Sequence, residues 1–342
     1  MKMDIMFSLI VPVFNRPDEV RALLESLAAQ TDRGFECIIV EDGSTVPCRG
    51  ECVEYEEIVP LKYFFKENEG RSIARNYGME RANGDYFVFV DSDCLLPPDY
   101  FASLRQALTG DYADCFGGPD GAHESFSPLQ KAINFAMTSF LTTGGIRGGK
   151  VQLEKFVPRT FNMGFSRLVY ERVGGFREMF SEDIDMSTRI RKAGFNPRLF
   201  RDVKVYHKRR VSLRKFWRQV HVFGMSRITL RLLYPGSLKA VHWLPARFVV
   251  GSAAMLICTV VGLCIGRLGL ILASAPLALY ILLVFATASA EMQSVRLGAM
   301  SVATSLIQLW GYGTGFLKAY IDKIVLGRGR DIEKEISIRK GE

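Results

Sequence analysis

The chain has 342 residues, of which 48% are hydrophobic, and a formal net charge of +8. This length allows one large domain plus an appendage. Its seven cysteines are an odd number, and Cys48 and Cys52 have no histidine nearby. Composition therefore predicts reduced thiols, with a zinc site as the weaker alternative.

The first two hundred residues alternate between strand-like and helix-like segments, as a parallel α/β sheet requires. Residues 18–30 predict an amphipathic helix, because Val20, Leu23 and Leu27 fall on one face. Residues 71–81 predict a second helix. The predicted strands are residues 7–14, 35–40, 61–65 and 86–90.

Three of the predicted strands end in polar residues, at positions 15–16, 41–42 and 91–93. In parallel sheets, ligands bind beyond the carboxyl ends of the strands. Asp91 and Asp93 follow a buried strand at i, i+2 spacing, which brings two carboxylates to that edge for Mg²⁺ or Mn²⁺. Helix caps and solvated loops share this spacing. The sequence as a whole favours a metal and diphosphate site.

Hydrophobic residues gather in the last third of the chain. Residues 248–266 and 268–290 are uncharged runs, and each matches the roughly 20 apolar residues that cross a bilayer core. Residues 297–317 are less apolar, and they either lie in the interface or form a third span. Residues 201–247 contain twelve Lys or Arg and one acidic residue, Asp202. This basic segment suits an anionic membrane surface, so nucleic-acid binding is not needed to explain it.

These features predict a protein of the inner (cytoplasmic) membrane with its amino-terminal domain in the cytosol. Residues 1–4 lead directly into a strand-like segment without the regions of a signal peptide. The positive-inside rule favours two spans, because the tail contains Lys318 and Lys323 among other basic residues. Three spans are the alternative.

Residues 144–150 have the glycine and lysine spacing of a phosphate-binding P-loop. Val151 stands where that loop requires Ser or Thr, and residues 139–143 are a mediocre strand. We interpret the segment as an acceptor loop, with Arg147 and Lys150 available for a phosphate on the acceptor.

Six short motifs occur in one order along the chain. They are residues 9–15 (LIVPVFN), 40–44 (VEDGS), 68–70 with 74–76 (NEG and ARN), 91–93 (DSD), 174–176 (GGF) and 182–183 (ED). This set resembles the family 2 inverting glycosyltransferases over residues 6–230. The resemblance implies a GT-A (Rossmann-like) α/β fold, a nucleotide-sugar donor and Mg²⁺ or Mn²⁺. Residues 1–230 would form the catalytic domain, and residues 231–342 a membrane-associated region with a basic cytosolic tail.

The resemblance also assigns a donor site. Phe14 would stack on the base and Asp42 would accept a uracil-type N–H, which favours a UDP-sugar. The alternatives are a core position for Phe14 and an Asx turn for Asp42. Arg75 either neutralises acidic residues or contacts the nucleotide. The complete donor-binding set is Pro12, Phe14, Asn15, Asp42, Arg75 and Asp91.

Other residues are assigned to metal binding and to proton transfer. Asp93 should ligate the metal directly, and Asp91 through water unless it holds the ribose. His207 is either another ligand or a surface residue near the membrane. Inversion needs a base opposite the leaving group, and the resemblance assigns it to Asp183, paired with Glu182 at a helix start. The alternative is a charge placed there by the helix dipole.

The expected reaction is the transfer of a single sugar to a lipid-linked glycan or another cell-envelope acceptor. The Gln-x-x-Arg-Trp signature of processive synthases is missing at residues 216–221. Polyprenyl-phosphate sugar transferases are an alternative, although Cys94 and Leu95 stand where they usually carry Leu-Gln. A catalytically idle scaffold subunit that retains nucleotide affinity is an alternative from another class.

Overall fold

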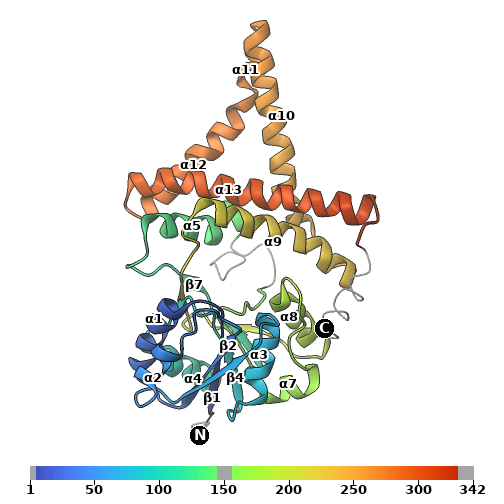
Figure 1. Cartoon of the computed structure of the whole chain (residues 1–342). Coiled ribbons are helices and arrows are strands. Elements are labelled where there is room, and N and C mark those ends of the chain that lie inside the picture. Colours follow the sequence, from blue (N-terminus) through green and yellow to red (C-terminus); the bar gives the residue numbers. More distant parts are fainter. Residues whose placement is uncertain (1–4, 145–155, 330–342) are drawn as a thin grey trace. The chain divides into compact units, whose positions relative to one another are not determined.

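The computed structural model describes residues 5–144 and 156–329 (Figure 1). They form two compact units, a sheet unit of residues 5–124 and 156–208 and a helical unit of residues 125–144 and 209–329. The chain therefore enters the helical unit twice. This division by packing does not follow the boundary expected at residue 230, because residues 125–144 and 209–230 pack with the carboxyl-terminal helices.

The sheet unit is built on seven strands in the order β3-β2-β1-β4-β8-β6-β9. Strands β1 to β4 are parallel, as expected, while β8 runs antiparallel to both β4 and β6. Strand β9 is parallel to β6. The strands are β1 (Phe7–Val13), β2 (Phe35–Asp42), β3 (Leu61–Lys66), β4 (Tyr86–Phe89), β6 (Cys115–Gly117), β8 (Met163–Ser166) and β9 (Arg198–Leu199).

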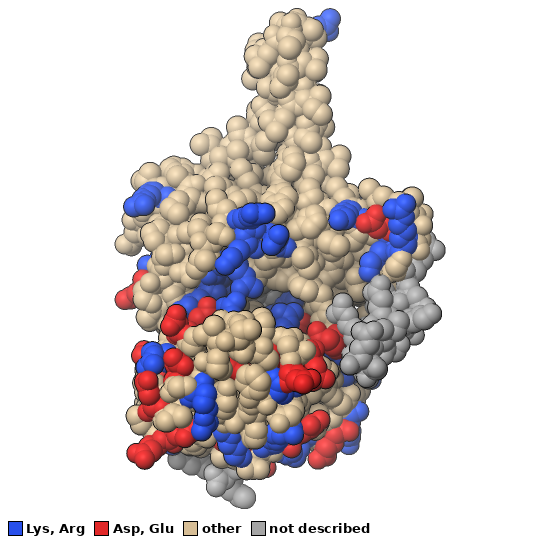
Figure 2. Space-filling model, in the orientation of Figure 1, with Lys and Arg blue, Asp and Glu red and all other residues tan. Residues whose placement is uncertain are grey.

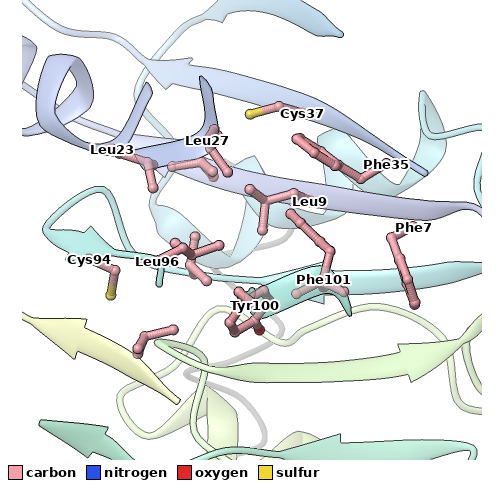
Figure 3. Packing of buried hydrophobic residues seen from close by; sticks show 14 of the residues in the cluster. Phe7, Leu9, Leu23, Leu27, Phe35, Cys37, Cys94, Leu96, Tyr100 and Phe101 are labelled. Atoms are coloured by element: carbon pink, nitrogen blue, oxygen red, sulfur yellow. The ribbon is translucent and has the colours of Figure 1, made fainter. Parts of the chain in front are cut away.

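Helices cover both faces of this sheet, so its central strands are buried on both sides. On one face, Phe7 and Phe35 pack with Phe101 of α4, whose ring stacks on Phe35 with centroids 4.2 Å apart (Figure 3). On the other face, Ile10 and Phe89 pack in a second apolar cluster. The first face carries α1 (Pro17–Ala28), α2 (Arg49–Tyr55) and α4 (Tyr100–Gly110); the second carries α3 (Arg71–Glu80), α7 (Arg167–Val173) and α8 (Glu182–Lys192).

A second, three-stranded sheet lies beside the polar end of β4. Its order is β5-β10-β7, from β5 (Cys94–Leu95), β10 (Val205–His207) and β7 (Asp120–Gly121). His207 pairs with Cys94, and Val205 pairs with Asp120. Backbone register thus gathers three segments that are far apart in the sequence.

Most differences from the expected elements occur at their ends. Strand β2 continues to Asp42, so that Asp42 belongs to the strand rather than to the loop after it. Helix α8 begins at Glu182, so Glu182 and Asp183 are the first two residues of the helix at whose start they were expected. In the segment 139–143, considered as a strand, Phe140–Thr143 form the short helix α6. Of the acceptor loop expected at residues 144–150, residues 145–150 lie outside the described residues.

The helical unit holds the two apolar runs predicted as spans. By length and composition, Ala240–Ile265 and Leu268–Glu291 can each cross a membrane, with mean hydropathies of 2.5 and 2.4. Only 17% and 6% of these segments are buried, whereas the core helix of a soluble protein is mostly buried. Their apolar surface is uninterrupted along the hairpin on the face in Figure 2. The hairpin comprises the 3₁₀ turn Ala240–Trp243, α10 (Leu244–Ile265), α11 (Leu268–Ile271), the 3₁₀ turn Leu272–Ser274 and α12 (Ala275–Glu291).

The third run forms α13 (Val295–Ala319), which is not apolar enough to count as a span among the described helices. It packs within the helical unit against α10, α12, α5 (Pro128–Thr138) and α9 (Leu213–Leu233). Its buried face is formed by small and polar residues, among them Ser301, Thr304 and Gly315. Thr304 donates a hydrogen bond to the carbonyl of Ala132 in α5 (2.9 Å). Small side chains therefore let α13 approach its neighbours closely, as glycine-rich helix pairs do.

Close packing of α13 on α9 predicts a sharp difference between two glycine substitutions. A Cβ added at Gly315 would overlap the backbone carbonyl of His221, whereas one added at Gly251 of α10 meets nothing within 4 Å. Gly315→Ala should destabilise the protein by about 1–3 kcal/mol through overpacking. Gly251→Ala should keep or raise stability, by up to ~1 kcal/mol from helix propensity. Thermal unfolding of the full chain in detergent measures both, and equal melting temperatures would contradict the close approach.

Candidate active site

The loops after β1 and β2 are tied together at the carboxyl edge of the large sheet. Asn15 adopts a left-handed backbone conformation (φ 54°), and its N–H donates to the Ser44 hydroxyl (2.7 Å). Its side-chain oxygen accepts from Val46 N–H (2.9 Å) and the Thr45 hydroxyl (3.1 Å). Phe14, just before it, is 48% exposed and therefore not a core residue. Pro12 is half-buried in β1. Phe14 thus offers a flat apolar surface beside two fastened loops.

Asp42 lies next to this surface and holds the loop that leads into α3. Its carboxylate accepts from Lys66 Nζ (2.9 Å), Gly70 N–H (2.8 Å) and Glu69 N–H (3.1 Å). These partners differ from those of an Asx turn, in which the bond goes two residues along the chain. The following Gly43 has φ +71°, and an added Cβ would lie 2.6 Å from Asn68 N. This residue must be glycine for the Asn68 loop to close on Asp42.

Asp93 and His207 are brought together by the small sheet. His207 Nε2 lies 3.1 Å from Asp93 Oδ1, and its Nδ1 lies 3.6 Å from Oδ2 of buried Asp120. Arg16 Nη1 lies 3.6 Å from Asp93 Oδ2. Asp93, Cys94 and His207 offer ligand atoms within 4.8 Å of one another. Of the two sequence alternatives for His207, the structure thus favours a place in the acidic cluster.

This donor set suits a hard or borderline divalent cation. Carboxylate oxygens with an imidazole nitrogen are ligands that Mn²⁺ accepts and that Mg²⁺ accepts in part. Cys94 adds no soft ligand, because burial raises the pKa of its thiol well above the usual value. The thiol instead donates to the carbonyl of Phe161 (3.6 Å). Cys94 and the other six cysteines are free, as the sequence predicted.

The side chains of Asp91 and Asp93 have different partners. Its Oδ1 accepts from Arg75 Nη2 (2.8 Å), and it is not part of the group formed with His207. Arg75 itself is fully buried, and its Nη1 donates to Glu182 Oε1 (2.9 Å). Arg71 donates to the other oxygen of Glu182 (2.7 Å). Two roles were left open for Arg75. Its contacts with Asp91 and Glu182 agree with the neutralisation of acidic residues.

Glu182 is the buried end of this network. Burial raises its pKa, against the opposing effect of Arg71 and Arg75. The side chain is 2% exposed and both oxygens face arginines. These contacts are those of a residue that anchors the start of α8, rather than of one that meets a substrate.

Asp183, next along α8, has a separate set of partners. It follows Ser181, a non-glycine residue in the left-handed region (φ 67°), which turns the chain into the helix. Asp183 Oδ1 accepts from Ile184 N–H (2.8 Å) and Oδ2 from Arg159 Nη1 (3.2 Å). Burial alone would raise its pKa, but Arg159, Arg71 and the Ile184 N–H hold that pKa below its usual value. Asp183 is therefore an ionised carboxylate with a 16% exposed side chain.

Sequence reasoning missed three residues of this region: Arg71, Asp120 and Arg159. Arg71 lies one turn before Arg75 on α3, so helix periodicity could have indicated it. Asp120 and Arg159 reach the site through long-range pairing, for which the sequence carries no local signal.

The order of the strands can be compared with the folds of solved structures. Across 90% of this chain and 87% of the other, the structure is similar to a mannosyltransferase from Pyrobaculum calidifontis, PcManGT, solved with GDP-Man and Mn²⁺. The TM-score is 0.58 and the identity 18%, which establishes the fold alone. The predicted Rossmann-like GT-A fold is thereby confirmed.

The family follows from the sequence. Residues 8–174 match the profile of Glycosyl transferase family 2, and through this region the chain belongs to that family. It is 36% identical to Glycosyltransferase GlyA of Streptococcus pneumoniae serotype 4 over 115 residues, which is 33% of this chain and 16% of the relative. It is 37% identical to the uncharacterized glycosyltransferase YibD of Escherichia coli K12 over 108 residues, 31% of each. The chain thus spans less than a third of the length of both relatives.

The Arg75 network predicts unequal effects of two arginine substitutions. Arg75→Met should destabilise the protein by about 3–5 kcal/mol, because it leaves Glu182 buried with one partner fewer. Arg21→Met, which removes an exposed arginine paired with Glu54, should leave the free energy of unfolding unchanged. Chemical denaturation of the two variants beside the wild type measures the difference. A mild effect of Arg75→Met would show that the buried pair is dispensable.

Proposed function

We propose that this protein is a metal-dependent inverting glycosyltransferase that transfers one sugar from a nucleotide-sugar donor to a lipid-linked glycan or another cell-envelope acceptor. One observation carries the proposal. The sheet unit contains both a carboxylate and imidazole cluster, Asp93 with His207, and a separate ionised carboxylate, Asp183, held at a helix start. A binding subunit has no need of the second group, whereas inverting transfer requires a base.

The donor would lie along the edge formed by the ends of β1, β2 and β4. Exposed Phe14 supplies a surface on which the base stacks. Asp42 lies at the adjacent strand end, and Pro12 and Asn15 fix the backbone between them. Asp91, 33% exposed and oriented by Arg75, faces the ribose or a metal-bound water. The complex of the structurally similar PcManGT with GDP-Man supports a nucleotide-sugar donor.

Asp93 and His207 are the residues that would hold Mn²⁺ or Mg²⁺ against the diphosphate. When bound, the cation offsets the negative charge that develops on the leaving nucleoside diphosphate. Asp120 lies on the far side of the His207 ring, 3.6 Å from Nδ1, and so favours an orientation with Nε2 toward Asp93. Arg16 lies on the other oxygen of Asp93 and limits its rotation.

Asp183 would act as the base. Its carboxylate accepts the proton of the acceptor hydroxyl as that oxygen attacks the sugar from the side opposite the diphosphate. Glu182 supports it from the buried side of α8 through its bonds to Arg71 and Arg75. Nothing in this arrangement requires a second catalytic carboxyl, so Glu182 is assigned a positioning role.

The two apolar helices support a membrane location, and a location at the membrane supports a lipid-linked acceptor, because confinement there raises the local concentration of such a substrate. A screen of purified full-length protein against UDP-, GDP- and dTDP-sugars tests the function. Nucleotide release is read with and without Mn²⁺, and with polyprenyl phosphate or a lipid-linked glycan as acceptor. Release only with polyprenyl phosphate would indicate a polyprenyl-phosphate sugar transferase. No release with any donor, together with retained nucleotide binding, would indicate a scaffold.

Two aspartate variants should fail in different ways. Asp93→Ala should abolish metal-dependent binding of nucleoside diphosphate, because the cation loses a charged ligand. Asp183→Asn should keep that affinity and lose turnover by about 10²- to 10⁴-fold, the usual contribution of a positioned base. Calorimetry with Mn²⁺ and initial rates measure the two effects, with Asp202→Asn, at an exposed position, as the control. Undiminished affinity of Asp93→Ala would remove Asp93 from the site.

We also propose two spans, with the catalytic domain and the tail in the cytosol. In a background without Cys258 and Cys264, Arg267→Cys at the hairpin tip should react with an impermeant thiol reagent on intact cells. Ile338→Cys in the tail should react only after permeabilisation. Labelling of Ile338→Cys from outside would establish three spans, and protection of Arg267→Cys would argue against the hairpin crossing the membrane.

A further inference from the structure

We propose that Arg159 is a positioning residue for Asp183, which it keeps ionised and oriented for proton transfer, and that it thereby sets the low-pH limit of activity. This inference rests on the proposed function, in which Asp183 is the base. Arg159 belongs to none of the motifs that carried the family resemblance. Its assignment comes from geometry alone.

The carboxylate of Asp183 is fixed at both oxygens by groups of different kinds. The Ile184 N–H on Oδ1 belongs to the same helix and fixes the rotation of the side chain. Arg159 on Oδ2 comes from the loop before β8 and supplies a full positive charge. Since a carboxylate oxygen has two lone pairs, each oxygen can still accept a proton beside these bonds.

Arg159 is itself held in place by a rigid turn. Asn162 N–H donates to the Arg159 carbonyl (2.9 Å). The fully buried Asn162 side chain donates to the carbonyls of Val203 (2.7 Å) and Pro119 (3.2 Å) and accepts from the Tyr100 hydroxyl (2.8 Å). The turn is thus anchored to segments next to β7 and β10. An arginine presented from such a turn has little freedom to leave its carboxylate.

One hydrogen-bond donor of the Arg159 guanidinium is not used by the described residues. Its buried Nε has no hydrogen-bond partner among residues 5–144 and 156–329. A buried N–H without a partner is costly in free energy and therefore uncommon. Among the described residues, the guanidinium therefore meets Asp183 through Nη1 while its buried Nε makes no hydrogen bond.

The charges around Asp183 come from three elements. Arg71 acts on it from α3, Arg159 from the loop before β8, and Glu182 precedes it on α8. Arg159 is the largest of the effects that oppose burial, ahead of Arg71. Asp185, one residue beyond Ile184, is paired with Arg189 (2.8 Å) and Arg177 (3.4 Å) and so has its own cations. Without Arg159, the effect of burial on the pKa of Asp183 is opposed mainly by Arg71, which also forms an ion pair with Glu182.

The sign of the effect follows from this balance. A lowered pKa keeps Asp183 ionised down to acidic pH, so its protonation does not limit the wild-type enzyme near neutrality. Without Arg159 the pKa should rise, and the fraction of enzyme with an ionised base should fall as the pH is lowered. Lysine at 159 restores the charge with a shorter reach and without the planar guanidinium.

The test compares pH profiles of kcat/KM for sugar transfer by the full-length enzyme with Mn²⁺. Relative to its own value at pH 8, Arg159→Gln should lose activity on acidification about one pH unit higher than the wild type does, because a one-unit rise in the pKa of the base moves the acidic limb of the profile by one pH unit. Arg159→Lys should recover most of that loss. Arg177→Gln, on the neighbouring pair at Asp185, is the matched control and should follow the wild-type profile.

Two results would overturn the inference. A uniform loss for Arg159→Gln at every pH would assign it a purely structural role. Weaker calorimetric binding of nucleoside diphosphate plus Mn²⁺ would make it a donor ligand instead. Failure of the proposed function would look different: the Asp183→Asn variant would retain transfer, because Asp183 would then not be the base.

In that case, melting temperatures still test the ion pair between Arg159 and Asp183. Arg159→Gln should lower the melting temperature of the wild type but not that of Asp183→Asn, and equal shifts would exclude the interaction.

Discussion

The buried bridge of Arg75 is the interaction on which the rest of the site depends. The guanidinium of Arg75 joins Asp91, which follows β4, to Glu182 at the start of α8, which is 107 residues from Arg75 in the sequence. Removing charges from water costs several kcal/mol per ion, and only good geometry on both sides offsets that cost. The bridge therefore holds the proposed donor site and the proposed base at a fixed spacing, and the neighbouring contacts of Arg71 and Arg159 extend it.

Backbone pairing places the residues of the proposed metal site. His207, Asp93 and Asp120 come from three segments that meet only in a small sheet, where His207 pairs with Cys94. Asn162 then connects the segments beside this sheet to the turn that carries Arg159. The charges of the site are thus placed by main-chain pairing and one buried amide, so their geometry does not depend on flexible surface side chains.

Sequence reasoning reached the parts of the protein that have local signals. The alternation of strands and helices predicted the parallel sheet, and the polar residues at the strand ends predicted the edge where a ligand would bind. Both patterns are local, because each extends over only a few residues. The position of Phe14 at the surface and the contact of His207 with Asp93 needed the fold to decide between alternatives. Asp120 and Arg159 could not be predicted, since their partners are 87 and 24 residues away and no periodicity connects them.

The double entry of the chain into the helical unit has a consequence for the order in which the protein is made. Helix α5 is synthesised early, yet Ile133 and Met137 are buried against Phe216 of α9 and beside Ile307 of α13. The bond from Thr304 to Ala132 spans 172 residues. While the ribosome produces the remainder of the sheet unit, α5 has no partner for its apolar face. Only the release of α13, near the end of the chain, completes the helical unit, so exposure of α5 during synthesis is built into the topology.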